Sequence, residues 1–87
     1  MRSSVDMVIS QRQFWELSQR YRLSPRQRDI VQAILSGALH IKDLRRTRGI
    51  NPRTLASQLY RINKKMHSGS LAEILYLFVR DAKDIGP

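Results

Sequence analysis

Four helix-start signals divide this chain, and they constrain its fold more than any other feature of the sequence. Ser10 and Ser24 are each followed three residues later by glutamine, and Ser70 is followed at the same spacing by glutamate. This spacing is typical of the capping box, which satisfies free backbone amides in the first turn of a helix. In the fourth signal, Asn51 can cap free amides and Pro52 takes the first helical position. The signals predict a chain built from helices.

Apolar residues recur at helical spacing after these starts, and no segment alternates with a period of two. We therefore expect an all-α fold with four or five helices. Gly37 and Gly49 are placed to end the second and third helices. An earlier turn through Val5, Val8 and Ile9 would move the first helix upstream. The expected helices span residues 10–21, 24–36, 39–48, 51–66 and 70–83.

The helix expected over 51–66 has two chemically different sides. Leu55, Leu59, Ile62 and Met66 fall into one narrow apolar stripe at about 100° per residue. The opposite side is polar and cationic and carries Arg53, Ser57, Tyr60, Arg61 and Lys64. The whole segment contains no acidic residue. A helix with one core-facing stripe and uncompensated cations opposite it favours contact with a phosphate backbone.

The net charge of +9 is concentrated in the middle of the chain. Residues 1–22 carry +2, residues 23–50 carry +4, residues 51–69 carry +4, and residues 70–87 carry −1. Such a concentration indicates a polyanionic partner. The alternative is a basic surface that only keeps the protein soluble.

The last expected helix, 70–83, is apolar most of the way around. A helix of this kind is buried on more than one side, and in so small a chain we expect a partner to cover the second side. The residues expected at this interface are Leu71, Leu75, Phe78 and Val79.

Several classes of protein are disfavoured by what the sequence lacks. There is no cysteine, and the longest apolar run, residues 74–79, is far too short to cross a membrane. The first ten residues lack the pattern of a signal peptide, so we expect a cytoplasmic protein without membrane contact. His40 and His67 have no cysteine or paired carboxylates near them, and Asp29 and Asp43 sit among arginines, where surface ion pairs are expected. We expect no enzyme, no metal site and no cofactor.

Two motifs together resemble the LuxR/FixJ-type (GerE-like) helix-turn-helix domain. The first is the run Leu-Ser-Pro-Arg-Gln-Arg-Asp-Ile-Val from Leu23, with Gly37 after it. The second is Gly-Ile-Asn-Pro-Arg-Thr-Leu from Gly49, with Leu, Arg, Ile, Lys and Met following at the family's spacing. The resemblance implies a domain over residues 23–87, preceded by an N-terminal helical extension over 1–22. It is closer than a likeness to sigma-factor region 4, whose recognition helix has an Arg-Val-Arg-Gln run that is absent here.

The resemblance also implies roles for the helices. Residues 24–36 would be the first support helix, 39–48 the scaffold helix, 51–66 the recognition helix, and 70–83 the helix through which such domains commonly dimerise. The sequence departs from the family in the loop after Gly37, which is one residue longer than usual, and at four positions in the helices. Ala56 and Gln58 stand where lysine and histidine are usual, and Arg45 and Arg48 replace a small and an apolar residue of the scaffold helix.

We therefore expect a stand-alone, sequence-specific regulator that binds double-stranded DNA as a homodimer through the last helix. The candidates for base edges or nearby phosphates are Arg53, Thr54, Ser57 and Arg61. The candidates for phosphates are Lys64, Lys65, Lys42, Arg45 and Arg46. The alternative is a protein-binding antagonist, which captures a heterologous regulator protein through the same apolar last helix.

Overall fold

The computed structural model describes residues 7–86, the side chain of Thr47 excepted, and these residues form five α-helices. Their bounds are α1 Gln11–Arg20, α2 Pro25–Leu35, α3 Ile41–Arg48, α4 Pro52–Met66 and α5 Leu71–Ile85. No strand occurs in this range, so the all-α prediction is confirmed there. Residues 1–6 of the expected N-terminal extension, Val5 among them, lie outside the described residues. Val8 and Ile9 lie in non-helical backbone, so the first helix has no earlier turn through them.

Capping chemistry explains where most of these helices begin. Ser10 and Ser24 both form complete capping boxes, in which the serine hydroxyl accepts from the amide three residues on and the Gln side chain accepts from the serine amide. At α5 the hydroxyl of Ser70 accepts from the Glu73 amide, and the Glu73 carboxylate accepts from the amide of Gly69 instead. Only α3 has no side-chain cap, and it begins two residues later than the sequence indicates.

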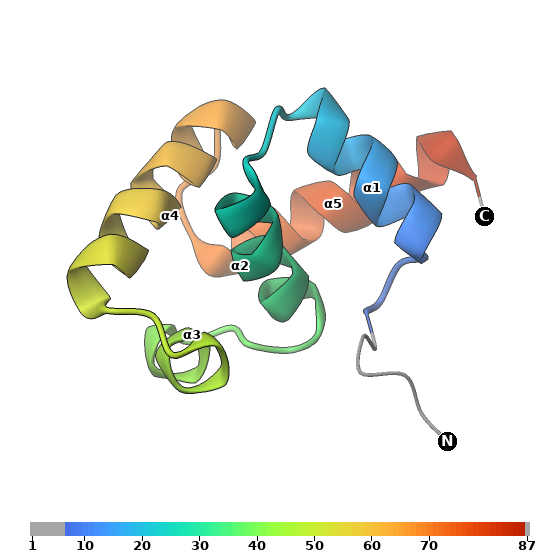
Figure 1. Ribbon diagram of the computed structural model, residues 1–87. Coiled ribbons are helices and arrows are strands. Elements are labelled where there is room, and N and C mark those ends of the chain that lie inside the picture. The colour runs from blue at the N-terminus through green and yellow to red at the C-terminus, as the bar shows by residue number, and fades with distance from the viewer. Residues whose placement is uncertain (1–6, 87) are drawn as a thin grey trace, which may run out of the picture.

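The hydrophobic core is centred on α2, which packs against α3, α4 and α5 (Figure 1). Its fully buried residues include Ile30, Val31 and Ile34. Among the described side chains of α3, Leu44 is the one buried in the core, and Ile50 is buried in the turn before α4. The apolar stripe of α4 is buried as predicted and consists of Leu55, Leu59, Ile62 and Met66.

The second side of α5 is covered by α1 of the same chain, which corrects one expectation. Phe78, expected at a partner interface, is fully buried, and the centres of its ring and the Phe14 ring lie 6.1 Å apart. The Tyr21 ring lies 5.6 Å from the Phe78 ring on the same side. The side chain of Gln13 adds two bonds, because its Nε2 donates to the carbonyl oxygens of Ala82 at 3.1 Å and Gly86 at 2.9 Å. Phe78 is therefore a core residue and is not available to a partner.

The arginines of α3 are accommodated without entering the core. Arg45 is exposed. Arg48 is half-buried, and its Nε lies 3.5 Å from Oδ1 of Asp29 on α2, an ion pair without a hydrogen bond. Arg48 therefore joins α3 to α2 through a charged contact. The expected surface ion pair of Asp29 is confirmed.

Candidate functional site

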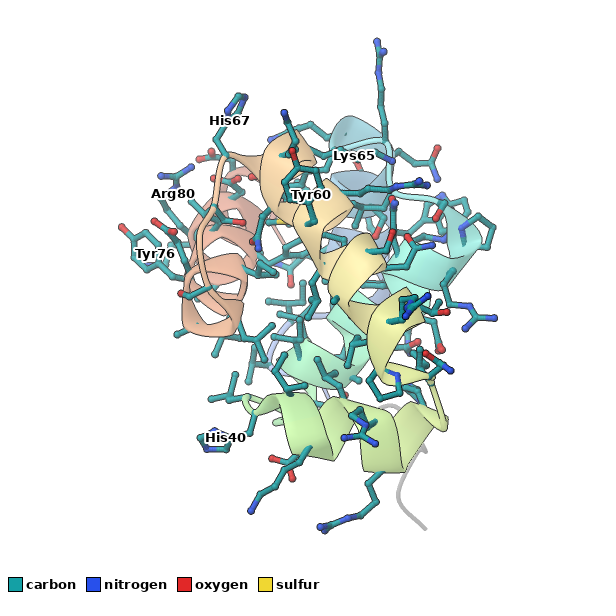
Figure 2. All side chains as sticks on the ribbon, turned by 90° about the vertical axis from the view of Figure 1, so that its left-hand side faces the viewer. His40, Tyr60, Lys65, His67, Tyr76 and Arg80 are labelled. Atoms are coloured by element: carbon teal, nitrogen blue, oxygen red, sulfur yellow. The ribbon has the colours of Figure 1, made fainter. Side chains whose placement is uncertain are left out.

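The side of α4 that faces away from the core is exposed along its whole length. Figure 2 looks onto this helix, with Tyr60 toward the viewer and Lys65 at the edge of the helix. No acidic residue occurs in α4. The four candidates for base contacts are exposed as predicted, and they are Arg53, Thr54, Ser57 and Arg61. Their contact with DNA stays a prediction.

The two neighbouring lysines of α4 have different surroundings. The Lys65 ammonium donates to the carbonyl oxygen of Arg22 and to Oε1 of Gln27, both at 2.7 Å. Lys65 therefore ties α4 to the turn between α1 and α2. The Lys64 ammonium lies 5.5 Å from the centre of the Tyr60 ring, on the exposed side of the helix. Of the two, Lys64 is the one whose charge is presented to solvent without a protein acceptor.

A buried polar contact fixes α2 against α4. The side chain of Gln27 is only 3 % exposed, although glutamine is usually a surface residue. Its Oε1 accepts from the Ser24 amide at 3.0 Å and from Lys65, and its Nε2 donates to Oε1 of Gln58 at 3.0 Å. Every polar atom of this side chain is therefore paired, as burial requires. Gln58, one of the departures from the LuxR-type pattern, serves here as the acceptor that joins the two helices.

A groove of about 420 Å³ lies between the first turn of α2 and the C-terminal half of α4. Three cations, two amide side chains and one hydroxyl line it, and no acidic residue does; the lining residues are Ser24, Gln27, Gln58, Arg61, Lys64 and Lys65. The N-terminal end of a helix adds partial positive charge to its surroundings, and the first turn of α2 contains no acidic residue to offset it. The groove is electrostatically suited to an anion such as phosphate.

None of the cations on α3 lines the groove beside α4. Arg46 lines a second hollow, of about 320 Å³, between α2 and α3, and Asp43 and Arg48 line the same hollow. Lys42 and Arg45 are exposed on α3. The structure thus brings Arg61, Lys64 and Lys65 together in one groove and places Arg46 in another part of the surface.

On α5, a strip of apolar side chains remains beside the part covered by α1. Tyr76 is 61 % exposed and Val79 is 36 % exposed, whereas Leu71 and Leu75 are half-buried. In Figure 2, Tyr76 and Arg80 point outward on the α5 side, away from Lys65. The strip and the α4 groove therefore lie on separate parts of the surface.

Two shifted pKa values, those of Tyr21 and Asp81, lie at the contact between α1 and α5. Burial, and then the bond that its hydroxyl donates to Asp81, raise the pKa of Tyr21 to about 12. For Asp81, burial acts to raise the pKa, but the bonds from Tyr21 and Arg80 and the nearby positive charges outweigh it, so the pKa is lowered. These groups hold α1 against α5.

Three residues of the α4 surface and of the groove beside it are not among the site residues predicted from the sequence. Tyr60, 63 % exposed in the middle of the outward side of α4, was visible in the helical period but is not among the candidates. Ser24 and Gln27 were identified as a capping box, a signal that reports only on their own helix. The bond between Gln27 and Lys65 joins residues 38 positions apart, and no local pattern indicates it.

Within residues 7–86, no helix has both the length and the apolar character needed to cross a membrane, and no three histidine or carboxylate side chains converge on a possible metal position. Comparison with protein-family models, with curated proteins and with solved structures gives no match. The function of this chain is therefore argued from its own residues.

Proposed function

We propose that this protein is a DNA-binding transcription regulator of the LuxR-like helix-turn-helix type and that α4 is its recognition helix. The observation that carries the proposal is the outward side of α4, which is exposed, cationic and free of acidic residues over a fully buried apolar stripe. The connection to α3 supports it, because only Gly49, Ile50 and Asn51 separate the two helices. A short turn containing glycine between two helices is typical of the helix-turn-helix motif.

The positions of the polar residues along α4 suggest which of them contact bases and which contact phosphates. Recognition helices place their N-terminal part against base edges in the major groove. Arg53 and Ser57 occupy this part, and an arginine that binds O6 and N7 of guanine contributes about 1–3 kcal/mol of discrimination. Arg61 and Lys64 lie farther along the helix and line the groove beside α2, where a backbone phosphate fits the charge.

The base-reading part of the proposal is tested by selecting binding sites from random duplex DNA and then titrating the selected and a scrambled duplex. The wild type should enrich one sequence. Arg53→Ala should lower its preference for that sequence by about 5- to 150-fold, the equivalent of one lost guanine contact. Lys83→Gln, a matched loss of charge at the far end of α5, should leave the preference unchanged. An unchanged preference in the arginine variant would exclude this side of α4.

The apolar strip of α5 supports a homodimer. Two copies joined by a two-fold axis through Leu71, Leu75 and Val79 would present two α4 helices to half-sites about one turn of DNA apart. Tyr76→Glu places a charge on this strip at an exposed position, so it should disrupt the dimer without disturbing the core. Sedimentation velocity should then show a monomer. A wild type that sediments as a monomer at all concentrations would contradict the dimer.

The same strip favours a second candidate, an antagonist that binds another regulator protein through α5. Ala56 adds to this case, because it removes a cation that LuxR-type domains commonly place on DNA. The two candidates differ in what Tyr76→Glu does. An antagonist would lose its protein partner and would show no DNA retention at low salt, whereas a DNA-binding regulator would retain DNA with reduced affinity.

A further inference from the structure

Two arginines, one in the turn between α1 and α2 and one in the first turn of α2, have side chains with no role in the proposed function. Arg22 and Arg26 are both exposed, on either side of the α2 cap Ser24. Arg22 has a φ of 58°, in the left-handed region, which L-residues with a bulky side chain rarely adopt. The Lys65 ammonium holds its carbonyl oxygen at 2.7 Å. The backbone of this turn is therefore fixed beside the C-terminal half of α4.

The charged side chains of this turn, of the first turn of α2 and of α4 are all positive, and Asp81 of α5, which accepts a bond from Tyr21 at the turn, pairs with Arg80. No acidic residue occurs between Leu17 and Arg28, in the first turn of α2, or in α4. The acids closest in sequence are engaged elsewhere, because Glu16 pairs with Arg12, and Asp29 lies in an ion pair on the α3 side of α2. In the described part of the chain, neither Arg22 nor Arg26 pairs with an acidic side chain.

The position of the turn determines which ligand it can share with α4. The Lys65 ammonium bonds both the Arg22 carbonyl oxygen and the groove residue Gln27, so the turn lies next to the groove that Arg61 and Lys64 also line. Neither Arg22 nor Arg26 lines the groove, so an anion confined to it would not engage them. A polyanion that carries a charge on every monomer would contact the groove and the two arginines at the same time.

We propose that Arg22 and Arg26 contact phosphates of the DNA backbone outside the bases that α4 reads. By this inference, which rests on the proposed function, the turn between α1 and α2 and the first turn of α2 extend the DNA-binding surface beyond the α3–α4 pair. Lys65 is a positioning residue, since it holds the turn against α4. Backbone contacts of this kind add affinity for any sequence and no discrimination between sequences.

The test is the salt dependence of binding to a 24-base-pair duplex, measured by fluorescence anisotropy for the full chain between about 50 and 200 mM salt. Each phosphate contact contributes about 0.9 to the slope of log affinity against log salt concentration. Arg22→Gln and Arg26→Gln should each lower the magnitude of the slope by about 0.9, and the double variant by about 1.8. Over this salt range the wild type should therefore lose about 12-fold more affinity than the double variant. Lys83→Gln is the single-charge control and should keep the wild-type slope.

The outcomes separate this inference from the proposed function. A double variant with a lower slope and an unchanged preference for a selected sequence supports the contact. A double variant with the wild-type slope overturns it and leaves the α4 proposal standing. A wild type that binds no duplex at 50 mM salt overturns both. Circular dichroism spectra identical to the wild type exclude loss of folding as the cause of a changed slope, since both substitutions are at exposed positions.

Discussion

Lys64 and Lys65 are adjacent on α4, and we expect Lys65 to stabilise the fold and Lys64 to bind DNA. Lys65→Met keeps the apolar stem and removes both 2.7 Å bonds, to the carbonyl of Arg22 and to Gln27. Hydrogen bonds to charged groups contribute about 1.5–3 kcal/mol each when shielded, and less when water can replace the donor. Because Lys65 is exposed, we expect a total loss of about 1–2 kcal/mol in the free energy of unfolding. Lys64→Met removes only an exposed cation–π contact and should cost about 0.5 kcal/mol.

Urea denaturation and salt-dependent DNA titration, carried out on both variants, test this reasoning. With a urea dependence of about 1 kcal/mol per molar, Lys65→Met should move the unfolding midpoint down by about 1–2 M. Lys64→Met should instead lower the magnitude of the salt slope by about 0.9, and Lys65→Met by less than about half of that. The reverse pattern, with a stable Lys65→Met that loses a full phosphate contact, would refute the assignment of Lys65 as a positioning residue.

Two further predictions concern the framework that holds α4. Gly49 ends α3 with a φ of 61° and has open space around it, so Gly49→Ala adds only backbone strain and should lower the free energy of unfolding by about 1–2 kcal/mol. Gly69→Ala, at a glycine without positive φ, is the control, and an equal loss there would contradict the explanation. Tyr21→Phe keeps the ring against Phe78, loses the bond to Asp81 and should cost about 1 kcal/mol at neutral pH. Since folding raises the pKa of Tyr21 from 10.0 to about 12, this contribution is complete below pH 10 and is lost as pH rises toward 12. The difference in stability between wild type and variant should shrink over that range, and a constant difference would contradict the raised pKa.

The helices were predictable because their capping chemistry is local. Ser10, Ser24 and Ser70 each specify a start through residues within one turn, and all three caps form. The expected start of α3 at Leu39 is two residues too early, because His40 makes no side-chain cap and Leu39 is 39 % exposed. Where no cap exists, an apolar residue before a helix is easily mistaken for part of it.

Contacts between residues far apart in the sequence could not be predicted from local patterns. The apolar character of α5 indicates that a second side is buried, but not that α1 covers it, so Phe78 was assigned to a partner and is in fact packed against Phe14. The exposure of Arg53 and Arg61 followed from the helical period alone. The role of Lys65 did not, because the atoms that it binds belong to another helix and its turn.

The central claim, that this chain binds duplex DNA through α4 and the groove beside it, is tested most directly by the affinity of the wild type for a duplex at several salt concentrations. The cations assigned to phosphates are Arg22, Arg26, Arg61 and Lys64. Four such contacts predict a slope of about −3 to −4 per protomer in log affinity against log salt concentration. No retention of the duplex at about 50 mM salt, or a slope shallower than about −1, would contradict the claim.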